Sequence, residues 1–211
     1  MNKTAIISGT TFVLAWVTGL LIAGGGPNPD ASAADVAAYF AAHQHAAMAE
    51  HFLIDAVAGV ALIGLAITAR RLSSVALAAG LAAAIVSLGQ AAIGEAMAIT
   101  ASGGSASTVH GLFVTLNNAD TIKIALLAVM IAATGLAARR RALPAWLTRA
   151  SLIFAPVLAI SGLAFTLGST GLYALLYLTL PLLLIWVAAF TIVIARRNPG
   201  LPARQASTVT G

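Results

Sequence analysis

Residues 51–71 read HFLIDAVAGVALIGLAITARR. The apolar part of this stretch, residues 51–69, is close to the roughly 20 helical residues that cross the hydrocarbon core of a bilayer. No charged residue lies between Asp55 and Arg70. Arginines that directly follow an apolar run are typical of the cytoplasmic end of a transmembrane helix. The stretch therefore predicts a membrane-spanning helix whose only ionisable groups within the span lie toward its outer end.

The composition of the whole chain leads to the same class of protein. Of the 211 residues, 60% are hydrophobic and 8% are charged, and the chain has no cysteine. The mean hydropathy of +0.98 is far above that of soluble domains. We expect one transmembrane domain over residues 1–197 and a disordered cytoplasmic tail over residues 198–211, where prolines and small polar residues gather. The lack of cysteine excludes disulfides and thiol catalysis.

Six apolar runs are long enough to span a bilayer, which predicts an all-α, polytopic membrane bundle of six transmembrane helices. Between these runs only short connections remain, apart from one long connection over residues 24–50. The six predicted spans cover approximately residues 5–23, 51–69, 74–99, 109–138, 147–167 and 171–195.

Basic residues mark one end of these spans, and the positive-inside rule assigns that end to the cytoplasm together with both termini. All six acidic residues and all four histidines then fall on the opposite side, where Lys123 is the sole basic residue. The pI near 10.5 does not indicate nucleic-acid binding, because the basic residues flank spans and form no contiguous face. The predicted cytoplasmic basic residues are Lys3, Arg70, Arg71, Arg139, Arg140, Arg141, Arg149, Arg196, Arg197 and Arg204.

The long outer connection begins with the helix breakers GGGPNPD and then becomes strongly helical. Ser32 followed by Asp35 is typical of a helix start, since the serine can cap the helix and the aspartate favours its first turn. We expect an outer helix that runs into the second span or meets it at a bend. The segment PNPDASAADVAAYFAAH, residues 27–43, resembles uncharacterised multi-pass membrane proteins of high-GC actinobacteria. This resemblance implies a plasma-membrane location and carries no known activity.

Ionisable residues of the second and fourth spans lie at matched depth. At about 1.5 Å per helical residue, Asp55 lies about 22 Å above Arg70. By the same count Lys123 lies about 24 Å above Arg139. A lone charge in lipid costs several kcal/mol, so Asp55 and Lys123 are predicted to pair. His51 precedes Asp55 by one helical turn and shares its face. The matched depth also predicts that the second and fourth spans are neighbours.

These polar groups favour an outward-facing cavity between spans two, three and four that binds a small ligand or ion. Coupling of this binding to protons is also compatible with the residues. Interhelical polar contacts also serve to fix helix register, so a structural or partner subunit of a membrane complex remains an alternative. The lipid bilayer is the expected partner, and no cofactor is strongly implied. The predicted ligand-binding residues are His51, Asp55, Glu95, Asn117, Asp120 and Lys123.

Two further kinds of chemistry remain open. An intramembrane acid–base enzyme, an isomerase or cyclase acting on a prenyl-like lipid, would use a buried carboxyl as general acid and a tyrosine ring to stabilise a cation. Its candidate catalytic residues are Asp55, Glu95, Asp120 and Tyr177. Imidazole and carboxylate groups also suit zinc, although their spacing here lacks an HExxH or cysteine pattern. The candidate metal ligands are His43, His45, Glu50, His51 and His110.

The predicted orientation is tested by labelling single cysteines with a membrane-impermeant thiol reagent. Asn28→Cys and Ser105→Cys are expected to react in intact cells, and Ala142→Cys is expected to react only after lysis, because the arginines place residue 142 inside. The parent chain has no cysteine, so each variant carries a single thiol. Labelling of Ala142→Cys in intact cells, with Asn28→Cys unlabelled, would reverse the topology.

Overall fold

The computed structural model describes residues 2–138 and 143–196, and all regular secondary structure in these residues is helical. Within them, six helical segments are long and apolar enough to cross a membrane, which confirms the predicted number of helices of transmembrane length. The predicted tail, 198–211, lies outside the described residues. In chain order the elements are α1 (Lys3–Ala23), α2 (Ala33–Ala42), α3 (Gln44–His51), η1 (Phe52–Val57), α4 (Ala58–Ala69), α5 (Ser74–Ala101), α6 (Ala106–Ala138), α7 (Ala145–Gly162), α8 (Ala164–Leu167) and α9 (Thr170–Arg196).

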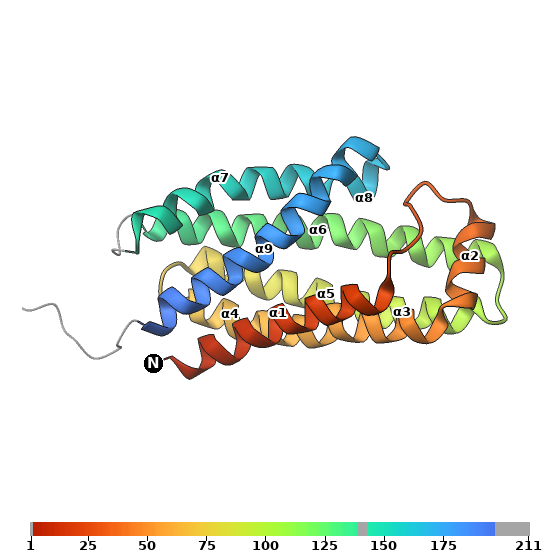
Figure 1. Cartoon of the computed structure of the whole chain (residues 1–211), viewed down its shortest axis with the longest axis horizontal. Helices are drawn as coiled ribbons and strands as arrows, with labels where there is room; N and C mark the ends of the chain where they lie inside the picture. The colour runs from red at the N-terminus through yellow and green to blue at the C-terminus, as the bar shows by residue number, and fades with distance from the viewer. Residues whose placement is uncertain (1, 139–142, 197–211) are drawn as a thin grey trace, which may run out of the picture.

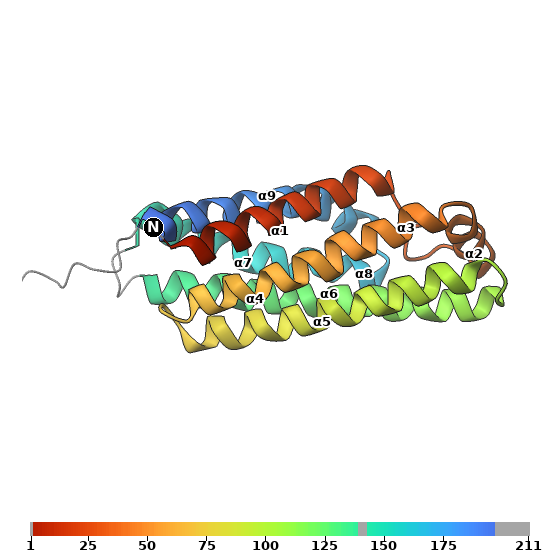
Figure 2. The same ribbon diagram turned by 90° about the horizontal axis from the view of Figure 1, so that it is seen from below.

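The six spans form a closed ring. Each span packs against the next one along the chain, and α9 packs against α1 to close the ring (Figures 1 and 2). Helix α5 therefore lies between α4 and α6, so the expectation that spans two and four are neighbours is wrong. The physical reason is that the buried face of α5 consists mainly of alanine, glycine and serine, which let its backbone approach both flanking helices closely.

The two ends of the bundle differ in charge. The start of α1, the end of α9 and the α4–α5 connection lie at one end, and α2 and the α5–α6 connection lie at the other, called here the α2 end (Figure 1). All described basic residues except Lys123 belong to helix termini at the first end, whereas the acidic residues belong to the half nearer α2. The charge separation expected from the sequence is therefore present along the long axis of the bundle.

The α5–α6 hairpin is longer than a bilayer core requires. Helix α6 has 33 residues, which corresponds to about 50 Å against a hydrocarbon core of about 30 Å. Helix α2 lies across the projecting part of this hairpin and packs against both of its helices (Figure 1). A second hydrophobic cluster forms there, separate from the main core, around Val36, Phe40, Met97, Val109 and Phe113.

The second span is an α-helix interrupted by a wider turn. It begins at Gln44, directly after a bend at His43, and so meets α2 at a bend as expected. Within η1 the N–H of Ala58 bonds to the carbonyl of Leu53, five residues earlier. Such π-turns occur frequently at functional sites. The sequence predicts a continuous α-helix here, whereas the structure has a π-turn that contains Asp55.

Candidate functional site

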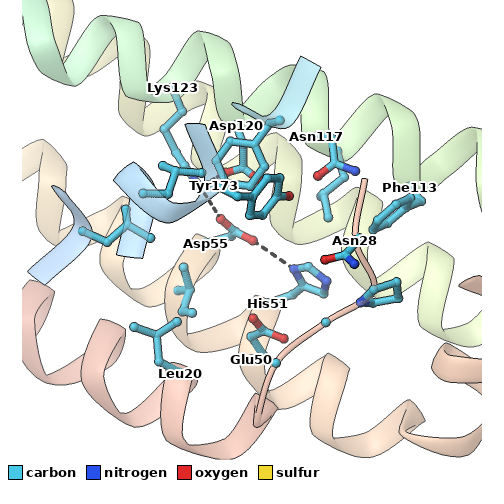
Figure 3. A pocket seen from close by; sticks show the side chains of 18 of the residues that line it. Leu20, Asn28, Glu50, His51, Asp55, Phe113, Asn117, Asp120, Lys123 and Tyr173 are labelled. Carbon is cyan, nitrogen blue, oxygen red and sulfur yellow. Dashed lines mark hydrogen bonds and ion pairs between the residues drawn. The ribbon is translucent and has the colours of Figure 1, made fainter. Parts of the chain in front are cut away.

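Lys123 lies between two carboxylates inside the ring. Its Nζ is 2.9 Å from Oδ1 of Asp55 and 2.9 Å from Oδ1 of Asp120. Lys123 is 3% exposed and Asp55 is 4% exposed, so both charges are withdrawn from the surface. The long lysine side chain reaches from α6 to η1, which is how residues on non-adjacent spans meet (Figure 3). The pairing of Asp55 with Lys123 predicted from depth is present.

The second oxygen of Asp55 is used by His51. Nδ1 of His51 lies 3.0 Å from Oδ2 of Asp55, so one carboxylate joins an imidazole and an ammonium (Figure 3). Ser87 on α5 donates a hydrogen bond of 3.0 Å to the backbone carbonyl of Asp55, which ties the π-turn to the neighbouring helix. We refer to His51, Asp55, Asp120 and Lys123 as the charge cluster.

Two residues that the sequence analysis did not select support the charge cluster. The ring centroid of Trp16 on α1 lies 5.8 Å from Nζ of Lys123, a cation–π distance. Gly94 on α5 faces His51, and a Cβ atom at this position would overlap the imidazole ring. Neither residue is ionisable, so a search for charged and metal-ligating types does not find them. The signal available was a Trp within the apolar first span, one helical turn after Phe12.

A cavity of about 270 Å³ borders the charge cluster. Its walls come from spans one, two, four and six, from α2 and α8, and from residues 25–28, and none of the lining residues belongs to α5. The cavity was expected between spans two, three and four, and this expectation is wrong for span three, which does not line it. Because α5 packs so closely through small residues, it leaves no space at that side, and the open volume lies on the α1 and α9 side.

The cavity occupies the junction between two hydrophobic clusters. The main core contributes residues from α1, η1, α6 and α9, and the smaller cluster beneath α2 contributes the remaining apolar wall. The unfilled volume therefore lies where the two clusters meet. The lining residues of the main core include Trp16, Ile54, Ile124 and Leu176, and those of the smaller cluster are Phe40, Phe113 and Leu116.

The connection after α1 covers one side of the cavity. Gly24 and Gly25 have φ angles of 64° and 108°, which favour glycine and turn the chain back over the bundle. The hydroxyl of Tyr39 on α2 donates to the carbonyl of Gly25 and holds this turn. Partial burial, with a smaller contribution from the charge of Glu50, raises the pKa of Tyr39, so its hydroxyl keeps the proton that it donates. Pro27 and Asn28 then reach the cavity wall.

Several polar groups at the cavity remain available. Nδ2 of Asn117 is buried without a hydrogen-bond partner, and the residue is 8% exposed. Glu50 makes no hydrogen bond or ion pair within the described part of the chain. Within the described residues, Asp120 contacts Lys123 through Oδ1, and its second oxygen makes no ion pair. The cavity therefore offers a carboxylate, a carboxylate oxygen and an amide to an incoming molecule.

The other predicted residues are dispersed. Glu95 on α5 does not line the cavity, whereas Tyr177 on α9 does. His43 stacks on Tyr39 with ring centroids 4.5 Å apart. His45 and His110 lie outside the cavity lining. In residues 2–138 and 143–196 no group of three or more His, Cys, Asp or Glu side chains is placed to hold a metal ion, so the five candidate ligands do not form one site.

Comparison with known proteins finds no matching family model, curated protein or solved structure. The function must therefore be argued from the geometry and chemistry of the site itself.

Removal of either partner of the central ion pair is expected to have unequal effects. Lys123→Met leaves Asp55 and Asp120 without their cation and is expected to lower the free energy of unfolding by roughly 3–5 kcal/mol. Asp55→Asn is expected to cost less, because Lys123 keeps Asp120. The double variant should regain much of the loss. Reversible unfolding in detergent micelles measures all three, and strictly additive losses would show that the residues do not interact.

The role of Gly94 is tested against a glycine on the same helix. Gly94→Ala is expected to displace the His51 imidazole and lower the unfolding midpoint, since the added methyl overlaps the ring. Gly89→Ala meets no atom within 4 Å and should gain up to about 1 kcal/mol of helix propensity. NMR of labelled histidine follows the His51 ring, with His51→Gln for assignment. An unchanged His51 signal in Gly94→Ala would exclude this positioning role.

Proposed function

We propose that this membrane protein binds a small ligand or ion in the cavity beside the charge cluster. The observation that carries the proposal is that the cavity borders both Asp55 and Lys123. Polar groups that serve only to fix helix register are expected to be fully paired and packed against other side chains. Here the charge cluster opens onto a cavity of about 270 Å³, and the Nδ2 atom of Asn117 in the wall of the same cavity has no partner, which favours a binding role.

The proposed orientation places the α2 end and the cavity outside the cell and both termini in the cytoplasm, in the plasma membrane. The support for it is the gathering of basic residues at the opposite end of the bundle. In this orientation a ligand reaches the charge cluster from the extracytoplasmic side, past residues 25–28 and α2.

The charge cluster suits binding because its geometry is fixed before a ligand arrives. Lys123 is held by two carboxylates and by the ring of Trp16, so little side-chain entropy remains to be lost on binding. The volume lies just below the roughly 300–1,000 Å³ of pockets for drug-sized molecules, so a smaller molecule fits. His51, bonded to Asp55, supplies the group through which binding is coupled to protons.

Filling the cavity is expected to abolish binding without unfolding the bundle. Leu20→Trp on α1 enlarges a side chain of the cavity wall, whereas Leu14→Trp makes the same change at an exposed site of the same helix outside the lining. Both variants should melt close to the parent. Native mass spectrometry of protein purified from its own membrane should find a non-lipid adduct in the parent and in Leu14→Trp, and none in Leu20→Trp.

Thermal melts with fractionated small-metabolite extract provide the second readout, because a bound ligand stabilises the folded state. A parent protein with no adduct and no stabilisation by any fraction would refute the proposed function and leave the cluster as a structural device.

A further inference from the structure

We propose that the ligand of this cavity is a small organic ammonium ion that also carries a hydroxyl group. This inference rests on the proposed binding function and names its ligand class. It starts from the formal charges of the side chains that line the cavity. Three carboxylates, Glu50, Asp55 and Asp120, face one ammonium, Lys123, so the lining carries excess negative charge whether His51 is neutral or protonated.

The excess charge is not shared equally among the carboxylates. Both oxygens of Asp55 already have a partner, because one binds Lys123 and the other binds His51. Asp120 binds Lys123 through one oxygen, and Glu50 makes no ion pair among the described residues. The available negative charge therefore lies on Glu50 and on the second oxygen of Asp120, which belong to the second and fourth spans (Figure 3). A cation between the two spans neutralises both.

The walls of the cavity favour an organic cation over a metal ion. All three tyrosines of the chain, Tyr39, Tyr173 and Tyr177, line it. Aromatic faces attract alkylammonium groups through the ring quadrupole, and such rings are the common means of binding quaternary amines. A metal ion would instead need converging oxygen or nitrogen ligands, and the described residues contain no such group. The further aromatic lining residues are Trp16, Phe40, Phe113 and Phe165.

The amide of Asn117 places a second requirement on the ligand, a hydrogen-bonding group, which is independent of the ligand's charge. Its Nδ2 is buried without a partner, and its side chain lines the cavity (Figure 3). A buried amide left unpaired costs free energy, so a ligand that completes its hydrogen bonding is favoured. A hydroxyl both donates and accepts, and therefore satisfies Asn117 in either orientation of its amide.

The test uses the full-length protein in lipid nanodiscs and isothermal titration with small ammonium ions. Ethanolamine and choline are the hydroxyl-bearing probes, propyltrimethylammonium lacks the hydroxyl, and dimethylbutanol is the uncharged carbon isostere of choline. At least one hydroxyl-bearing ammonium ion is expected to bind saturably, propyltrimethylammonium more weakly, and dimethylbutanol not at all. Sodium chloride at matched ionic strength should not displace the bound probe.

Variants assign the binding to the proposed groups. Glu50→Gln is expected to weaken the binding of the ammonium probe by at least about tenfold, since it removes the unpaired carboxylate. Glu95→Gln removes a carboxylate outside the cavity and should leave binding unchanged. Asn117→Leu should remove the preference for choline over propyltrimethylammonium while keeping affinity for the latter. Thermal melts of the variants confirm that each is folded.

The outcomes separate this inference from the function on which it rests. Equal binding of dimethylbutanol, displacement by sodium, or equal loss in Glu50→Gln and Glu95→Gln would each overturn the ammonium assignment. If the parent carries a purified adduct of other chemistry and binds no ammonium probe, the cavity is a binding site and the ligand class is wrong. If it carries no adduct and binds no probe, both proposals fall.

Discussion

The ammonium of Lys123, held between Asp55 and Asp120, is the interaction on which the rest of the structure depends. In a low-dielectric bundle an unpaired ammonium costs far more than the same group in water, so α6 is favoured at the depth where Lys123 reaches the carboxylate of Asp55. Asp120 is on α6 itself, and Asp55 is on η1 at the far side of α5. The ion pair therefore fixes the height of the fourth span against the second, although their backbones are not packed together.

That constraint also explains why a cavity exists here. Lysine is long enough to join two spans separated by a third, and the bulky walls that surround it do not close the remaining space. On one side α5 packs tightly through alanine and glycine, with Gly94 leaving room for the imidazole of His51. On the other side lies the junction between the main core and the smaller cluster beneath α2. The volume at this junction is lined by the charge cluster and by aromatic rings.

The features that could be predicted from the sequence are those set by distance along a helix axis. The spans follow from apolar length and flanking arginines, and the Asp55–Lys123 pair follows from the constant rise per residue. What the sequence did not predict depends on direction around the axis and on the order of the helices. Glu95 lies in the predicted outer half yet belongs to a helix that contributes nothing to the cavity, and Trp16 comes from a span whose sole ionisable residue is Lys3 at its start. The π-turn at FLIDAV carries no glycine or proline that would mark it.

The separation of Asp55 and Lys123 along the chain, 68 residues, has a consequence for biosynthesis. The second span leaves the ribosome carrying a carboxylate and an imidazole whose cationic partner has not yet been made. Until α6 follows, these ionisable groups disfavour the transfer of the second span into lipid. The Asp55–Lys123 ion pair can therefore form only after the fourth span has been made, whereas the last two spans, which close the ring, are not needed for it.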